Sequence, residues 1–204
     1  MEPADHEPIS NDDDALSLWV GRVARTHALL EYNVDNVHRF LVRQVGHAPG
    51  NKSVKGFDQL VRECRKLLQR SNVGPEIVTS GDTALLAARE ATGFRNRVVH
   101  DMWLPDPLRE DWELPRWNTF HRLSDVQESY NSANSQDLSM VVDTHTVLMR
   151  TRMRVSGLFM ALHATWRADR ARVEGSSGGD TMARYVALMT DRFILHANGD
   201  FDVT

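Results

Sequence analysis

An arginine, an asparagine and a histidine lie within six residues of one another in this sequence, as Arg95, Asn96 and His100. An arginine guanidinium is always charged and can bind a phosphate through several N–H groups. A histidine imidazole can give and take a proton near neutral pH. Cleavage of a phosphodiester needs charge stabilisation on the phosphate and proton transfer at the reacting oxygens. These residue types therefore predict a phosphodiester-cleaving site.

The three residues fall in a region with helical periodicity. Small and apolar side chains recur on one face of that helix, at Ala84, Ala88, Ala91, Val98, Val99 and Met102. Arg95 lies inside this core-facing stripe, and a buried arginine needs a partner, so an anion, a crevice or a second subunit is expected there. On an ideal helix His100 projects about 140° from Arg95, and the two side chains are expected to meet easily only where the helix frays or a second copy crosses. Asn96 and His100, four residues apart, share a face.

This pattern resembles the HEPN superfamily, whose signature is an Arg, four to six residues and then a His, often with a polar residue such as Asn directly after the Arg. Here these are Arg95, Asn96 and His100, near the end of an interior helix of a mainly helical chain. The resemblance implies an all-α bundle of four to five helices that forms a homodimer with the two motifs facing each other. Some relatives carry a tyrosine for nucleotidylation two residues after the His, but this chain has Met102, so that form of control is not expected.

The resemblance also implies a metal-independent endoribonuclease. Single-stranded RNA would be cleaved by attack of a ribose 2′-hydroxyl on the neighbouring phosphate, leaving a 2′,3′-cyclic phosphate. His100 would move protons, Arg95 would hold the phosphate, and Asn96 would orient the histidine or the backbone. Glu31 and Arg97 are supporting candidates, with Glu31 a partner for Arg95 if the first and third helices are neighbours. No metal or other cofactor is expected.

Families with this architecture often act in toxin and antiphage systems, so the resemblance implies an antitoxin or another regulatory protein as a partner besides RNA. The main alternative is a binding or sensor module for a protein or nucleotide, in which Arg95 pairs with a buried carboxylate and His100 caps the helix. A third reading places a metal pair on one edge of the first helix, at His27, Glu31, Asp35 and His38, because carboxylates and imidazoles on bundle helices can bind metals.

The composition is that of a soluble globular protein with one substantial core, since 41% of the 204 residues are hydrophobic and 25% are charged. Six of the 28 acidic residues lie within the first 14 positions, and the remaining 22 face 24 basic residues, a balance mildly favourable to RNA. No apolar run approaches the roughly 18 residues of a membrane span, the N-terminus lacks a secretory signal, and Cys64 is the single cysteine. These features predict a cytoplasmic protein with no membrane partner.

The chain is expected to consist of a disordered acidic lead-in, residues 1–11, and one helical domain, residues 12–204. Apolar periodicity predicts a long helix up to about residue 45, a second helix from residue 57 with Cys64 in its core face, and a third from about residue 80 to Trp103. Residues 46–56 and 71–80 are expected to be loops. An irregular or hairpin segment is expected over 104–123, with Trp112, Trp117 and Phe120 either stacking on bases or covering the bundle. A long helix over 138–171 and a short one over 180–196 complete the prediction.

Overall fold

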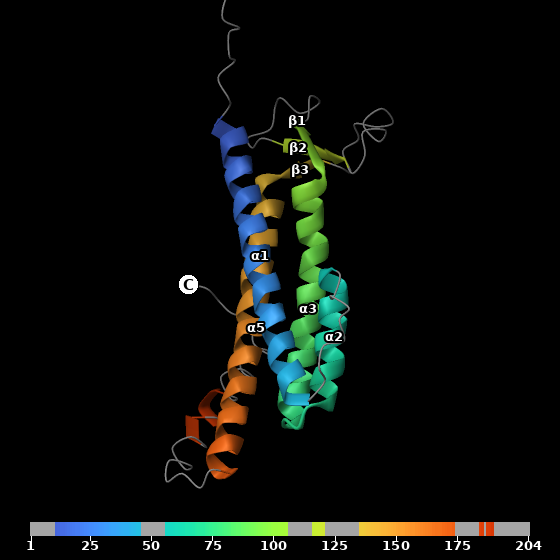
Figure 1. Cartoon of the computed structure of the whole chain (residues 1–204). Coiled ribbons are helices and arrows are strands. Elements are labelled where there is room, and N and C mark those ends of the chain that lie inside the picture. The colour runs from blue at the N-terminus through green and yellow to red at the C-terminus, as the bar shows by residue number, and fades with distance from the viewer. Residues whose placement is uncertain are drawn as a thin grey trace, which may run out of the picture. The chain divides into compact units, whose positions relative to one another are not determined.

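The computed structural model of the chain describes residues 11–45, 56–105, 116–120, 135–173, 184–185 and 187–189. Helices dominate these ranges, and the expected helical bundle is confirmed. The long helices are α1 (Asn11–Val45), α2 (Phe57–Arg70), α3 (Pro75–His100) and α5 (Leu138–Val173), coloured from blue through green to orange in Figure 1. The expected lead-in, apart from Asn11 at the start of α1, and the expected loop over 46–55 lie outside the described residues. Within the described ranges, no helix is both long and apolar enough to cross a membrane.

The chain divides into two compact units. The first, called the motif unit, takes in the described parts of Met1–Thr26 and Gly93–Val147. The second, called the cavity unit, takes in the described parts of His27–Thr92 and Leu148–Thr204. Helices α1, α3 and α5 each contribute residues to both units, whereas α2 belongs to the cavity unit.

The cavity unit is built around the apolar faces of its helices. On α1 and α2 the fully or almost fully buried positions recur every three or four residues, as Leu30, Val34, Val37, Leu41, Val61, Cys64, Leu67 and Leu68. This spacing places them on one face of each helix, where burial removes them from water. Cys64 is a core residue as predicted, and its thiol donates to the carbonyl oxygen of Val34 at 3.6 Å. The α1–α2 packing is therefore close enough for side chain to meet backbone.

Helices α2 and α3 are joined by a short turn, because α3 begins earlier than the sequence indicated. The expected loop over 71–80 is wrong from Pro75 onward, where the first turn of α3 starts. Proline suits this position since its missing N–H is not needed in a first helical turn. The Gly74 carbonyl accepts hydrogen bonds from the backbone N–H groups of Ile77 and Val78 at 3.0 and 3.1 Å. The Gly-Pro pair thus starts a helix.

Within the cavity unit, α3 contacts α2 and α5 around Gly81 and Asp82. The Arg65 guanidinium of α2 donates two hydrogen bonds to the Asp82 carboxylate of α3, at 2.5 and 2.9 Å. One residue earlier, Gly81 lies so close to Leu158 of α5 and Leu68 of α2 that a Cβ there would be 2.7 and 2.8 Å from their methyl groups. A glycine at position 81 therefore allows three helices to approach one another.

In the motif unit, α3 ends at His100 and is followed by a three-stranded antiparallel sheet. Strand β1 (Met102–Pro105) pairs with β2 (Arg116–Phe120), with Met102 opposite Phe120, and β2 pairs with β3 (Ser135–Asp137). For the irregular or hairpin segment expected over 104–123, the antiparallel pairing of β1 with β2 fits the hairpin alternative, although β1 already starts at Met102, and the expected helix end at Trp103 is wrong. The Trp103 indole N–H donates to the Val98 carbonyl oxygen at 3.0 Å, which holds the start of β1 against the last turn of α3.

Helix α5 starts directly after β3. The Asp137 carboxylate accepts hydrogen bonds from the backbone N–H and the hydroxyl of Ser139, as an N-cap residue does. Further along the motif unit, the Trp19 ring of α1 meets the edge of the His145 ring of α5 with centroids 5.4 Å apart. The Arg22 guanidinium lies 4.5 Å from the centroid of the same Trp19 ring. The Trp19–His145 contact joins α1 to α5 in this unit, whereas the Arg22–Trp19 contact lies within α1.

Candidate active site

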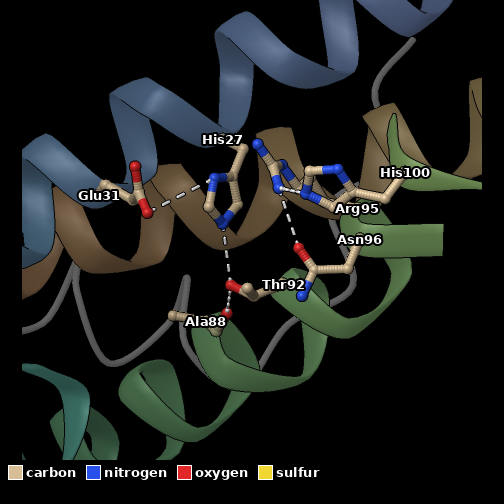
Figure 2. A network of polar contacts seen from close by, with 7 residues as sticks. All are labelled: His27, Glu31, Ala88, Thr92, Arg95, Asn96 and His100. Atoms are coloured by element: carbon tan, nitrogen blue, oxygen red, sulfur yellow. Dashed lines mark hydrogen bonds and ion pairs between the residues drawn. The ribbon is translucent and has the colours of Figure 1, made fainter. Parts of the chain in front are cut away.

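The last turns of α3 bring the three candidate catalytic side chains together. Nη1 of Arg95 donates to the Asn96 side-chain oxygen at 2.9 Å and lies 2.8 Å from Nε2 of His100. Figure 2 shows the Arg95 guanidinium pointing toward both partners. All three residues belong to the motif unit and to one helix, so their geometry depends on local helix structure.

The contact between Arg95 and His100 forms within a single copy of the chain. The expectation that the two side chains meet only through fraying of the helix or through a second subunit is therefore wrong. His100 is the last residue of α3, and the helix is regular up to it, with the Asp101 N–H donating to the Arg97 carbonyl at 3.2 Å. The large angle between the two positions is bridged because the arginine side chain is long and its head group is free to turn along the helix surface.

The hydrogen-bond chemistry of this pair determines where the proton sits on His100. A guanidinium has five N–H donors and no acceptor, so His100 must accept through the Nε2 lone pair. In this arrangement the imidazole is neutral and carries its hydrogen on Nδ1. An Nε2 lone pair is what a general base requires. Asn96 receives its bond through its oxygen, which leaves its N–H₂ group as a donor.

Arg95 is less exposed to solvent than its two partners. Asn96 and His100 are exposed, whereas Arg95 is half-buried. Its Nε atom is buried and has no hydrogen-bond partner among the described residues. The expected core-facing stripe holds for Ala84, Ala88, Ala91 and Val98, which are buried, but Val99 is only half-buried and Met102 belongs to β1. Arg95 thus lies at the margin of the stripe, with its stem covered and its terminal N–H groups within reach of His100.

The two supporting candidates, Arg97 and Glu31, have different surroundings in the described structure. Arg97 is exposed, and no ion pair or side-chain hydrogen bond involves it within the described residues. Glu31 belongs to the cavity unit, where its carboxylate lies 3.9 Å from Nδ1 of His27. The expected pairing of Glu31 with Arg95 stays a prediction. Of the aromatic side chains expected near the motif, Trp112 lies outside the described residues, and only the backbone of Trp117 and Phe120 is described, in β2.

His27 has a structural role that sequence analysis missed. Its side chain is buried, and Nε2 lies 3.0 Å from the Thr92 hydroxyl, which itself donates to the Ala88 carbonyl at 2.9 Å (Figure 2). Since the hydroxyl has one hydrogen, it accepts from His27, whose Nε2 is therefore protonated. The burial of His27 could have been predicted from the helical spacing, because His27 lies four residues after Val23 and three before Leu30, both core positions.

The four residues of the metal reading do not gather into a site. Among the described residues, no group of three or more His, Cys, Asp or Glu side chains is placed to hold a metal ion. His27 bonds to Thr92, and Asp35 forms an ion pair with Arg39 at 2.7 Å. His27, Glu31 and Asp35 therefore take part in helix-packing and helix-surface contacts.

His145, a histidine of the motif unit outside the Arg95 motif, has an altered pKa. Desolvation by burial lowers the pKa of His145, and the nearby positive charge of Arg22 lowers it further. Both effects disfavour the charged imidazole. His145 packs edge-on against Trp19, so its neutral ring serves as an aromatic partner in the α1–α5 contact.

Three comparisons of the chain with known proteins found no relative. No family model, no curated protein and no solved structure matches the chain.

Proposed function

We propose that the chain is a metal-independent endoribonuclease of HEPN type that cleaves single-stranded RNA. The observation that supports this most is the direct contact between Nη1 of Arg95 and Nε2 of His100, at 2.8 Å on an exposed helix end. A cation beside an imidazole lone pair supplies the two functions that phosphodiester cleavage requires, which are charge stabilisation and proton transfer. The expected cytoplasmic location and a regulatory antitoxin belong to the same proposal.

In the proposed reaction His100 removes the proton from a ribose 2′-hydroxyl through Nε2. The 2′-oxygen then bonds to the adjacent phosphorus while the bond from phosphorus to the 5′-oxygen breaks. Arg95 donates N–H groups to the non-bridging phosphate oxygens, whose negative charge grows as the 2′-oxygen attacks. The products are a 2′,3′-cyclic phosphate and a 5′-hydroxyl, and the leaving 5′-oxygen must take up one proton to form that hydroxyl. Asn96 holds the guanidinium in place through its side-chain oxygen.

The proton balance supports a homodimer as part of the proposal. One His100 that has just accepted the 2′-hydroxyl proton on Nε2 can return it to the leaving oxygen only if that oxygen comes within hydrogen-bond reach. A second His100 from a facing copy, present as an imidazolium with a proton on Nε2, can deliver that proton to the leaving 5′-oxygen from the opposite side of the phosphate, while the first His100 keeps the proton of the 2′-hydroxyl. Two motifs facing each other would also place two Arg95 side chains on one phosphate group.

The test is an RNA cleavage assay with the full chain, a fluorophore-labelled single-stranded RNA and excess EDTA. Wild-type protein is expected to yield fragments ending in a 2′,3′-cyclic phosphate. His100→Ala and Arg95→Ala should each reduce the rate constant by roughly 10²-fold or more, since each removes a group that acts in the transition state. Circular dichroism confirms that both variants keep their helix content.

Matched controls come from the cavity unit. Arg43→Ala removes an exposed arginine in the last turn of α1, and His38→Ala removes a half-buried histidine of the same helix. Both should cleave RNA at the wild-type rate. If the wild-type protein leaves every RNA intact in EDTA, or if the motif variants cleave as fast as these controls, the proposal is wrong.

A further inference from the structure

The cavity unit contains a pocket that the proposed reaction does not use. The pocket has a volume of about 530 Å³ and is lined by the C-terminal portions of α1, α2 and α5 together with the turn that leads into α3. Pockets of roughly 300 to 1,000 Å³ are typical of sites for small molecules. All of its lining residues belong to the cavity unit, so the pocket is independent of the Arg95 motif.

Aromatic rings form one wall of the pocket. Phe40 of α1 and Trp166 of α5 both line it, with ring centroids 6.4 Å apart and ring planes nearly perpendicular at 88°. His163 does not line the pocket, but its ring centroid lies 6.0 Å from that of Phe40 and 5.9 Å from that of Trp166. Rings held in place by further rings offer a preorganised surface for a flat heterocycle.

Charged and amide side chains also line the pocket. Arg70, at the end of α2, has no ion pair or hydrogen bond within the described part of the chain. Arg170 lies with its guanidinium 5.6 Å from the Trp166 ring centroid, and Asp169 supplies the single acidic side chain of the described lining. Gln44 and Asn72 add amide groups that can both donate and accept. The side-chain charges sum to one positive charge, which favours a ligand with one or two negative charges.

The partial negative charge of the helix C-termini at the pocket offsets the net positive charge of the lining side chains only in part. A helix C-terminus carries about half a negative charge, spread over its last carbonyls. At the end of α2, the Leu68 carbonyl already accepts hydrogen bonds from the Ser71 N–H at 3.2 Å and the Ser71 hydroxyl at 2.6 Å. The full charge on Arg70, at the tip of a long and exposed side chain, can therefore approach an anion beyond the reach of these partial charges.

We propose that this pocket binds one nucleoside monophosphate, with the base against Phe40 and Trp166 and the phosphate at Arg70. The ribose hydroxyls and base edge find partners in Gln44, Asn72 and Asp169. A nucleotide combines the flat ring, the single anionic group and the hydrogen-bonding groups that the lining provides. The proposal goes beyond ribonuclease activity and does not depend on it.

The test is isothermal titration calorimetry of the full-length His100→Ala protein with AMP, GMP, CMP and UMP in turn. This background variant prevents RNA chemistry, so binding can succeed or fail independently of cleavage. At least one nucleotide should bind with a Kd below about 1 mM, and its nucleoside should bind roughly tenfold more weakly. Binding of none of the four nucleotides would overturn the proposal.

Variants of two residues test where the phosphate and the base of the nucleotide bind. Arg70→Ala should weaken nucleotide binding roughly tenfold and change nucleoside binding less than twofold, because it removes only the phosphate contact. Trp166→Ala should weaken both by roughly tenfold or more, whereas Trp166→Phe should retain most of the binding because it keeps a stacking ring. Loss of equal size for nucleotide and nucleoside in Arg70→Ala would overturn the assignment.

The matched control is Arg43→Ala, which removes an arginine adjacent in sequence to Gln44 that does not line the pocket. It should bind the nucleotide as the parent protein does. A drop equal to that of Arg70→Ala would mean that general surface charge attracts the ligand, and the site would be rejected. A short single-stranded RNA that binds this pocket with a lower Kd than any mononucleotide, and that loses its binding in Trp166→Ala, would likewise overturn the single-nucleotide assignment.

Discussion

Nη1 of Arg95 lies 2.8 Å from Nε2 of His100, so the two side chains form one hydrogen-bonded pair five residues apart on α3. Because arginine can only donate, Nε2 of His100 is the acceptor in this contact. A phosphate that binds Arg95 competes with His100 for the same N–H groups. Arrival of the substrate would thus release the imidazole lone pair at the site where a proton must be removed.

The first prediction concerns the shape of the Arg95 head group. Arg95→Lys keeps the positive charge but loses the planar fork that reaches Asn96, His100 and a phosphate together. We expect the RNA cleavage rate in EDTA to fall at least roughly tenfold while RNA affinity changes little, because the charge is retained. Single-turnover cleavage and fluorescence anisotropy measure the two quantities. A lysine variant as active as wild type would contradict a role for the planar guanidinium.

The second prediction concerns the helix contact at Gly81. A Cβ there would meet methyl groups of Leu158 and Leu68, whose side chains are fully buried and have little room to move. Gly81→Ala should therefore lower the free energy of unfolding by about 1 to 2 kcal/mol, even after the gain in helix propensity.

Gly21→Ala is the matched control, since Gly21 is also inside a helix but a Cβ there meets nothing within 4 Å. This variant should be more stable by about 0.5 to 1 kcal/mol, because alanine restricts the unfolded chain and favours the helix. Urea denaturation of the three proteins measures both changes. The same sign of change in the two variants would show that the close approach at Gly81 is incorrect.

The third prediction concerns the bidentate pair between Arg65 and Asp82. Both side chains are partly shielded, at 33% and 25% exposure, and the hydrogen bond to Asp82 raises the pKa of Arg65. A double-mutant cycle with Arg65→Met and Asp82→Asn should give a coupling free energy of about 1 kcal/mol. The more exposed pair of Lys66 and Glu63, at 62% and 37%, should couple by less than about 0.5 kcal/mol. The ranking would be refuted if urea denaturation gave the larger coupling for the Lys66 pair.

The fourth prediction concerns pH and His145. Burial, and then the charge of Arg22, lowers the pKa of His145 below its ordinary value of 6.5. The folded protein therefore binds fewer protons at this site than the unfolded chain, so stability from this group is present above pH 6.5 and falls as the pH drops toward the lowered pKa. His145→Gln should lose less stability than wild type between pH 7.5 and pH 5, as measured by urea midpoints.

Nuclear magnetic resonance titration of the imidazole isolates the effect of Arg22. Arg22→Gln should raise the pKa of His145 without restoring it fully, because desolvation remains. Arg39→Gln is the control, since Arg39 is paired with Asp35 at 2.7 Å and is not a cause of the His145 shift. A pKa of His145 that stays unchanged in Arg22→Gln would contradict the electrostatic contribution.

The periodic apolar residues made the helices predictable. The core positions of α2, Val61, Cys64, Leu67 and Leu68, follow directly from a repeat of three or four residues. The start of α3 was not predicted, because a Gly-Pro pair was interpreted as a loop, although proline is compatible with a first helical turn. The end of α3 was placed three residues late, since Pro105 was taken as the stop and strand pairing from Met102 was not foreseen.

The sequence by itself determined which residues could do chemistry, because Arg95, Asn96 and His100 are recognisable by type and spacing. Only the tertiary structure decided that Arg95 and His100 touch within one chain, since side-chain length and rotamer outweigh the angle between two helix positions. It also decided that His27 is buried against Thr92, and that Phe40, Arg70 and Trp166 line one pocket. Such contacts join residues far apart in the chain, and a local repeat carries no information about which distant face each helix meets.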